Sequence, residues 1–557
     1  MEDYQVRADL LIVGGGSAGC MAANRALELQ PDLKVAIFEK GDIKYSGSIA
    51  RGMDALNIVA IPDFTTPELY VEAITLSCAG VVDQAPSWEM ANRSFSLLKK
   101  LEGWGVYFPK DEKGNYRTLQ YHPKGKFLAA MEEPNLKVLI SQKALEKGAK
   151  VFNRVMGLQL LIDEDRVAGA VGIHVRTGEL ITCQAKAVIL AAGGTARFSL
   201  PNSGYLYGTF DYPGNTGDGY VMAFKAGARL TGMEYCQRTM LIKDANIPLL
   251  AITLTRGGRL LDIYDQVIME GQCHDLEAME RAFREGKGPL RIRLSHLKPE
   301  LIEEIEHILF TTERPIQERF FKGRGINFRH QDIELWPTEC QLCGGHGMAG
   351  IVVNKKAETS IPGLYAAGDV ACVPRQHLTG AFVFGEVAAE QAVNYISSIK
   401  HHLQIDDRQI IKIQKERNSR FNTAGKDIDV RDWEYKVRRL IGDYVISPKN
   451  EYKLLRWLEW AERLRHEGFT QVATSNGHEL SKSFEIDHII QCASFSARAA
   501  LERKESRWGM AHYRTDYPQR DDQNWLRHIV IYRGDGPNEI KVVTQPVQKI
   551  ETEGASK

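Results

Sequence analysis

The stretch from Ala8 to Gly19, ADLLIVGGGSAG, decides the fold. Ala8–Val13 is a short apolar run of the kind that forms a buried parallel strand. The glycines that follow form a GxGxxG pattern immediately before a good helix start. In this pattern Gly14 permits a tight turn, Gly16 lets the backbone approach a pyrophosphate, and Gly19 lets the helix pack on the strand. The sequence therefore predicts a dinucleotide site at a helix N-terminus, where free N–H groups favour an anion.

Three further segments belong to this site, and two of them indicate which dinucleotide it binds. A second apolar strand, Lys34–Phe38, ends at Glu39, where an acidic side chain is expected to bind the ribose hydroxyls. NAD and FAD sites share these features. Further along, Lys186–Gly194 (KAVILAAGG) is a buried strand entering a glycine pair, and Ile361–Asp369 (IPGLYAAGD) is an apolar strand ending in Gly-Asp. Both resemble segments of FAD flavoproteins, in which the Asp reaches the ribityl–phosphate part of the cofactor. The three pieces in this order predict FAD.

A set of short motifs then narrows the family. They are Asn215–Gly219 (NTGDG), Met222-Ala223, Ala226–Ala228 (AGA), Met233-Glu234, Glu505–Gly509 (ESRWG), His512–Pro518 (HYRTDYP) and Asp521–Leu526. Together they resemble the fumarate reductase and succinate dehydrogenase flavoprotein superfamily over nearly the whole chain.

The resemblance implies an α/β fold. Its parts are a Rossmann-like FAD-binding domain of the glutathione-reductase type, an inserted α+β capping domain, a helical domain and a C-terminal segment. The expected boundaries are 1–235 and 346–400 for the FAD-binding domain, 236–345 for the capping domain, 405–504 for the helical domain and 505–557 for the C-terminal segment. A helix over 381–399 is expected to close the second FAD-binding part.

The resemblance also implies a set of FAD-binding residues. They are Gly14, Gly16, Ser17, Ala18, Gly19, Glu39, Lys40, Ser46, Gly47, Gly194, Asn215, Thr216, Asp218, Gly368, Asp369, Ala381 and Phe382. Membrane succinate dehydrogenases attach FAD covalently to a His. Gly47 stands at that place here, so we expect non-covalent FAD.

Three substrate-binding devices of fumarate reductase are replaced in this chain. The Arg that precedes an Asp in the capping domain is missing from Ile263–Gln266 (IYDQ). A substrate-binding His is missing from Gln237–Leu241 (QRTML), and the segment that clamps a carboxylate reads Gln376–Ala381 (QHLTGA). Arg is the natural bidentate clamp for a carboxylate. These losses argue against turnover of a C4 dicarboxylate.

Within the superfamily, Cys343–Gly350 (CGGHGMAG) is similar to a segment of adenylylsulfate reductase alpha subunits. That resemblance implies a small anionic sulfur substrate and a site formed by Arg259, His346 and Asn57, with Arg256, Arg324 and Lys243 as further candidates. Each of the first three also has a structural interpretation: a surface salt bridge for Arg259, a loop position for His346, and a backbone cap for Asn57. A Glu of the sulfate enzyme has no clear counterpart in Glu132–Lys137.

Composition limits the function further. The chain has 557 residues, with 71 Lys+Arg and 71 Asp+Glu, so its net charge is zero and broad nucleic-acid binding is excluded. We find no transmembrane segment and no secretory signal, so we expect a cytoplasmic protein. The nine cysteines are scattered. Only Cys340 and Cys343 form a CxxC pair, which is half of a metal site at most, so we expect no metal and leave packing and redox roles open.

The chain carries no cluster motif and no second GxGxxG for a nicotinamide donor. Relatives of this type pair with a ferredoxin-like iron–sulfur subunit, so we expect such a partner in a hetero-oligomer. Trp508 and Trp525 are candidate contacts, although core packing is the favoured interpretation of each. Two alternatives stay open. One is a fumarate reductase-like enzyme acting on another carboxylic acid, and the other is an electron-transfer flavoprotein module without its own substrate.

Overall fold

The computed structural model describes residues 3–201, 211–243, 248–271, 275–313, 317–421, 423–536 and 539–550, with the backbone alone for Arg51, Thr239, Leu276, Glu313, Thr338 and Glu339. A five-stranded parallel sheet carries the dinucleotide loop. Its order is β19 (Leu364–Ala366), β11 (Ala187–Leu190), β2 (Leu10–Val13), β3 (Val35–Glu39) and β7 (Lys150–Asn153). Strands β2, β3 and β11 are buried along their whole length, because structure covers both faces of the sheet.

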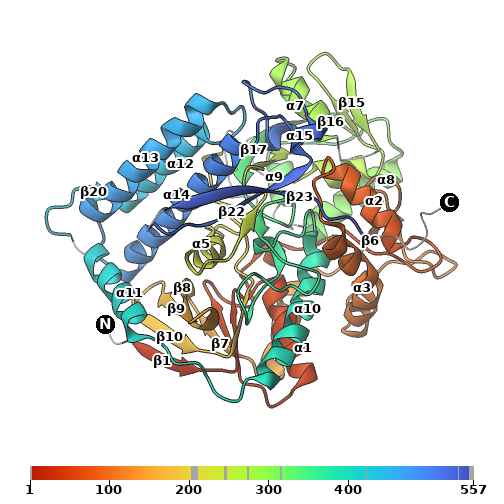
Figure 1. Cartoon of the computed structure of the whole chain (residues 1–557). Helices are drawn as coiled ribbons and strands as arrows, with labels where there is room; N and C mark the ends of the chain where they lie inside the picture. Colours follow the sequence, from red (N-terminus) through yellow and green to blue (C-terminus); the bar gives the residue numbers. More distant parts are fainter. Residues whose placement is uncertain are drawn as a thin grey trace.

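Helices cover one face of this sheet and a β-meander covers the other (Figure 1). The helical layer contains α1 (Ser17–Leu29), α4 (Leu136–Glu146) and α10 (His377–Ser398). The meander consists of β8 (Val155–Asp163), β9 (Arg166–His174) and β10 (Leu180–Gln184), with β1 (Tyr4–Arg7) added in parallel to β10. Helix α10 begins at His377, earlier than the predicted Ala381, and its start lies beside the turn of Gly368–Val370 that follows β19.

Smaller elements surround this layer. Helices α2 (Pro67–Ser77) and α3 (Gln84–Gly103) pack together, and α5 (Asp218–Lys225) packs on β8. A short antiparallel sheet combines β4 (Ala55–Leu56), β6 (Leu128–Ala130) and β5 (Thr118–Leu119).

The capping region is a five-stranded antiparallel sheet with its own apolar core. Its order is β13 (Gln237–Ile242), β17 (Ile333–Gln341), β16 (Leu290–Arg293), β14 (Arg259–Leu261) and β15 (Val267–Glu270). Around it lie α6 (Leu250–Leu254), α7 (Leu276–Arg284), α8 (Pro299–His307) and α9 (Gln317–Gly323). The chain enters this region through β13 and leaves it through β17. These two strands pair with each other, so both chain crossings lie side by side.

Four helices follow α10: α11 (Asp407–Arg420), α12 (Val430–Tyr444), α13 (Glu451–Thr470) and α14 (Gly477–Glu502). A two-stranded sheet of β20 (Ile428–Asp429) and β21 (Val472–Ala473) joins them. After the short α15 (Asp522–Trp525), the hairpin of β22 (Arg527–Arg533) and β23 (Ile540–Pro546) pairs with β12 (Leu230–Thr231), which also pairs with β18 (Gly350–Ile351). Within the described ranges, no helix combines the length and apolarity needed to cross a membrane.

A buried chain of charges ties the C-terminal segment to the FAD-binding part. Arg503 donates to Glu234 at 2.8 Å and to Glu505 at 2.7 Å, and Arg507 donates to Glu505 at 2.6 Å. All four side chains are 0% exposed, and Arg507 reaches Asp522 at the rim. Because two guanidinium groups share Glu505, its carboxylate is the central counter-charge of this network.

Replacing Glu505 by Gln is therefore expected to destabilise the fold by about 3–5 kcal/mol, since it removes the fully buried carboxylate that both guanidinium groups share and leaves Arg507 paired with Asp522 at the rim. The measurement is urea-induced unfolding followed by tryptophan fluorescence. The matched control is Glu459→Gln, which breaks a half-exposed pair with Arg456 and should cost under about 1 kcal/mol. Equal unfolding midpoints for the two variants would show that the network adds nothing.

Candidate active site

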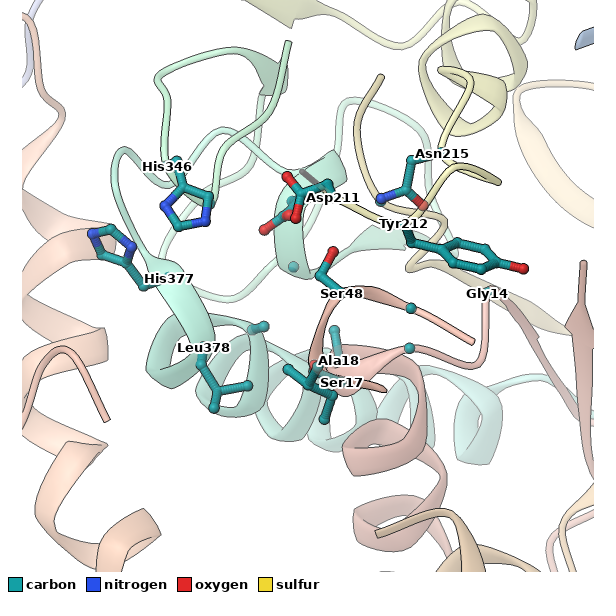
Figure 2. Close-up of a pocket in the computed structure, with 18 of the residues that line it drawn as sticks. Gly14, Ser17, Ala18, Ser48, Asp211, Tyr212, Asn215, His346, His377 and Leu378 are labelled. Carbon is teal, nitrogen blue, oxygen red and sulfur yellow. The ribbon is translucent and has the colours of Figure 1, made fainter. Parts of the chain in front are cut away.

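One elongated cavity runs from the glycine loop after β2 to the capping region. Its walls come from the ends of β2 and β3, the loop before α5, the first turn of α10, and α6 of the capping region. Figure 2 shows this pocket with Gly14, Tyr212 and Asn215 on one side and two histidines on the other. Residues distant in sequence thus meet at the carboxyl ends of parallel strands, where α/β folds bind their ligands.

The glycine loop has the geometry that a pyrophosphate needs. Gly14 has φ +105°, and a Cβ there would lie 2.3 Å from the carbonyl oxygen of Ala191. A Cβ on Gly19 would lie 1.9 Å from the carbonyl oxygen of Gly14, so only glycine lets the helix pack on the loop. A Cβ on Gly16 would meet nothing within 4 Å. The backbone at Gly16 therefore faces open space, which is the space that the phosphates of a dinucleotide would take.

The acidic residue at the end of β3 is held by backbone amides. Glu39 is 4% exposed and accepts hydrogen bonds from the N–H groups of Gly15 at 2.8 Å and Gly41 at 2.6 Å. The carboxylate also lines the cavity. It is thus fixed where ribose hydroxyls would meet its remaining lone pairs.

Lys40 is a largely buried cation, with its side chain 14% exposed, and it links three parts of the chain. Its ammonium group lies 2.8 Å from Asp218 and 2.9 Å from Glu485 on α14, and it donates to Thr216 at 2.7 Å. Burial opposes the charge, but the two carboxylates raise the pKa of Lys40 above its ordinary value. Asp218 also contacts His488 at 2.8 Å. The NTGDG loop is therefore fixed by charge from both sides.

A second carboxylate pair faces the middle of the cavity. Asp369 and Asp211 both line it, and Figure 2 shows Asp211 between the histidines and Tyr212. Burial and then the charge of Asp211 raise the pKa of Asp369 to about 7. Gly345 packs against this group, because a Cβ there would lie 2.1 Å from Asp369 Oδ1. Asp211 is absent from the sequence-based set, because no motif marks its loop.

The predicted FAD-binding residues divide into two groups. Those that line the cavity are Gly14, Gly16, Ser17, Ala18, Glu39, Lys40, Gly47, Asn215, Asp218, Gly368, Asp369 and Ala381. Those that support the wall from behind are Gly19, Ser46, Gly194, Thr216 and Phe382. Gly194 is one example, since a Cβ there would lie 2.2 Å from the carbonyl oxygen of Leu342. Residues of the first group are the ones that would hold FAD.

Of the three predicted substrate residues, two line the cavity and one does not. Asn57 and His346 line the cavity, but Arg259 does not. Arg259 lies on β14 in a half-exposed ion pair with Glu270, at 3.1 Å. The contacts of Arg259 are therefore those of a salt-bridge partner, which is the structural interpretation given above.

The further cationic candidates also lie away from the cavity. Arg256 is held by Glu304 at 2.7 Å, and Lys243 by Glu334 at 2.7 Å. Arg324 stacks on Phe320, with the guanidinium 4.7 Å from the ring centroid. Each of these cations therefore has a partner within the capping region.

His377 is the main cavity residue that the sequence analysis did not select. Its ring centroid lies 5.1 Å from that of His346, and Figure 2 shows the two imidazoles side by side. It is 5% exposed, and neither ring nitrogen has a hydrogen-bond partner among the described residues. Burial, followed by the charges of His346, Arg375 and His122, lowers the pKa of His377 well below its ordinary value. The imidazole is therefore neutral at pH 7 and available to a ligand.

The signal for His377 was present in the sequence. The sequence pattern of Gln376–Ala381 indicates the loss of a carboxylate clamp, and the structure adds that this segment supplies the His377 imidazole to the cavity. The rest of the cavity wall near the histidines is largely apolar. It includes Met53, Leu128, Pro248, Leu249, Ala251 and Ile252. Among the described lining residues there is no Arg.

Comparison with known proteins agrees with this geometry. A model of the FAD binding domain matches residues 9–247, and a model of the fumarate reductase flavoprotein C-terminus matches residues 436–554. The glycine loop, the Gly-Asp pair and the cavity between them thus define an FAD-dependent oxidoreductase. More particularly, the chain belongs to the fumarate reductase and succinate dehydrogenase flavoprotein superfamily. The superfamily predicted from the motifs is confirmed.

Individual relatives are distant and span the whole chain. An uncharacterised FAD-dependent oxidoreductase of Methanocaldococcus jannaschii is 26% identical over 94% of this chain and 96% of its own. One subunit of the fumarate reductase (CoM/CoB) of Methanothermobacter marburgensis is 25% identical over 96% and 98%. The structure of adenylylsulfate reductase from Archaeoglobus fulgidus superposes with a TM-score of 0.88 at 25% identity, covering 99% and 98%. The predicted fold class is confirmed by this match.

The raised pKa of Asp369 predicts a pH-dependent stability of the FAD-free chain. A carboxyl whose pKa is raised on folding binds its proton more tightly in the native state, so stability is lost as pH rises through about 7. Between pH 6 and pH 8 we expect a loss of about 1.4 kcal/mol from this site. Thermal melts at the two pH values should show a drop that Asp369→Asn removes and exposed Asp32→Asn leaves in place. An unchanged drop in Asp369→Asn would contradict this.

Proposed function

We propose that this chain is the flavoprotein subunit of a two-component oxidoreductase that acts on a small anionic sulfur compound, as adenylylsulfate reductase does. The observation that carries the proposal is the imidazole pair of partly exposed His346 and buried His377 in the FAD cavity, where the superfamily's dicarboxylate enzymes use arginines. The similarity to the Archaeoglobus adenylylsulfate reductase structure supports the same substrate class.

The cofactor would lie along the cavity in one orientation. The loop from Gly14 to Ala18 would take the pyrophosphate and Glu39 the ribose, because these groups face that end. Gly368 and Asp369 would face the middle of the cofactor. Bound FAD would supply two-electron transfer at the end near the histidines. Gly47 leaves no side chain for a covalent link at that position, so we propose non-covalent binding.

The histidine pair would recognise the substrate by donating hydrogen bonds. The two imidazoles and the Asn57 amide can donate to oxygen atoms of a sulfur oxyanion, and the surrounding apolar wall would strengthen these bonds by excluding water. Behind the pair, Arg375 is 4% exposed and donates to the Tyr121 hydroxyl at 3.2 Å. This buried guanidinium would make the local potential positive without contacting the substrate. The arrangement suits one anionic centre better than the two carboxylates of fumarate.

A fumarate reductase-like reaction on another acid is the second candidate. The similarity to the Methanothermobacter fumarate reductase chain favours it. The apolar wall formed by Leu249 and Ile252 would then face a hydrocarbon part, and the histidines would take a single carboxylate.

Electrons would come from a small iron–sulfur protein. The described residues hold no group of three or more His, Cys, Asp or Glu side chains arranged for a metal, so we place the clusters in a partner protein. We also propose that this chain and its iron–sulfur partner work in the cytoplasm.

The first test is anaerobic reoxidation of the photoreduced holoenzyme, followed by the absorption of oxidised flavin. We expect rapid reoxidation by adenylylsulfate with release of sulfite, and none by fumarate, because no guanidinium among the described lining residues faces the cavity. Reoxidation by fumarate alone would favour the second candidate. No reoxidation by either compound would favour an electron-transfer module without its own substrate.

The second test asks whether His377, which lines the cavity, or Arg259, which the sequence motif implied, acts on the substrate. His377→Asn is expected to lower the rate of substrate reduction about 10²-fold while FAD stays bound, since it removes a donor to the developing anion. Arg259→Gln should retain the rate within about twofold, because its guanidinium pairs with Glu270 outside the cavity. His478→Asn, at an exposed position, is the matched control. A large loss in Arg259→Gln would restore the role that the sequence motif implied.

A further inference from the structure

Two buried cysteines meet where the chain enters and leaves the capping region. Cys236 precedes β13, Cys340 lies near the end of β17, and their side chains are 0% and 1% exposed. In the antiparallel pairing Arg238 is opposite Cys340, and Cys236 lies two residues before Arg238. All three side chains therefore project from the same face of the sheet. Each of the two thiols affects the ionisation of the other, which places them as neighbours.

This pairing differs from the CxxC pattern of the sequence. Cys343 lies beyond β17, and its Cβ would lie 2.8 Å from a Cβ placed on Gly194 of the FAD-binding part. Cys340 thus shares its surroundings with Cys236, which lies about a hundred residues away in the sequence, and not with its near neighbour. The spacing of cysteines along the chain does not reveal this thiol pair.

One buried cation, Lys449, and one partly exposed cation, Arg238, lie beside the two thiols. Lys449 is 0% exposed, and its ammonium group lies 3.8 Å from Cys236 Sγ and donates to the carbonyl oxygen of Glu234. Arg238 donates to the carbonyl oxygens of Ser447 and Pro337, and the charged groups that act on it are the two thiols. A buried cation such as Lys449 needs a counter-charge, and the Cys236 thiol is an acidic group 3.8 Å from its ammonium group.

Cys236 is the thiol that can supply this charge. Burial alone would raise its pKa, but hydrogen bonding to Cys340 and the charge of Lys449 lower the pKa of Cys236 to about 6. The Ser496 hydroxyl lies 3.1 Å from Cys236 Sγ and adds to this stabilisation. The pKa of Cys340 is instead raised, by burial and then by Cys236. The two thiols therefore differ in the way that a nucleophilic and a resolving cysteine differ.

We propose that Cys236 and Cys340 form a redox-active pair that closes a disulfide between the first and last strands of the capping sheet when a peroxide is present. The Cys236 thiolate attacks one peroxide oxygen, forming a sulfenic acid and releasing hydroxide, or water after protonation. The Cys340 thiol then attacks the sulfenic sulfur, which forms the S–S bond and releases a second water. Two thiols lose two electrons and hydrogen peroxide gains them, so the step balances. This site is independent of the substrate proposed above.

The chain contains a natural comparison for this site. Cys20 is also fully buried beside a buried lysine, with Lys137 Nζ 3.4 Å from its Sγ. Among the described residues no second thiol interacts with Cys20, and burial raises its pKa. Cys20 therefore has the lysine but lacks the resolving partner, and it should resist the same oxidation.

The test is oxidation of the reduced, FAD-containing full chain by hydrogen peroxide at pH 7, followed by alkylation in denaturant and peptide mass spectrometry. We expect a cross-link between the Cys236 and Cys340 peptides that dithiothreitol reverses, while Cys20 is recovered alkylated. In Cys340→Ser the sulfenic acid at Cys236 should persist and react with dimedone. Recovery of both thiols in alkylated form, or a Cys340–Cys343 cross-link, would overturn the proposal.

Variants of Lys449 test why Cys236 reacts. Lys449→Met should slow formation of the cross-link about fivefold, because the lower thiolate fraction outweighs the higher nucleophilicity of a more basic thiolate. Lys449→Arg keeps the charge and should react at close to the original rate, which controls for loss of folding. Equal rates in Lys449→Met and the unmodified chain would remove the lysine from the mechanism.

Discussion

The buried ammonium group of Lys40 is the interaction on which the site depends most. It joins the end of β3 to Asp218 at the start of α5 and to Glu485 on α14, so one charge connects the parallel sheet, the NTGDG loop and the helical layer. A largely buried cation tolerates little displacement of its partners, because separation would leave charges uncompensated where little water reaches them. The cavity wall is thereby fixed from both sides.

The polar groups of this cavity differ from those of the superfamily's dicarboxylate enzymes. The superfamily's dicarboxylate enzymes use guanidinium groups, which carry permanent charge and clamp carboxylates with two hydrogen bonds. Here His346 and His377 face the cavity, and the charge of Arg375 lies one layer behind them. The neutral His377 imidazole and the buried guanidinium of Arg375 are the basis for the single-anion substrate proposed above. The same scaffold thus holds a similar cofactor over a differently charged site.

The thiol pair shows that the fold can bring reactive groups together without a sequence motif that predicts it. The two chain crossings of the capping region must be neighbours, because an inserted domain leaves and rejoins the same sheet. That neighbourhood brings Cys236 to Cys340, and the packing of Lys449 against β13 adds the cation. The apparent motif, Cys340 and Cys343, is divided by the end of the strand.

The sequence by itself determined the cofactor site. GxGxxG after an apolar strand, Glu39 after the next strand, and the Gly-Asp pair of Gly368 and Asp369 depend on local geometry, and local geometry can be recognised from spacing. Tertiary structure alone decided which side chains share the substrate end of the cavity. Arg259 and His377 illustrate this, because strand β14 directs one to Glu270 at the surface, while the early start of α10 directs the other into the cavity. Side-chain direction depends on where an element begins and on what packs against it, and residue spacing predicts neither.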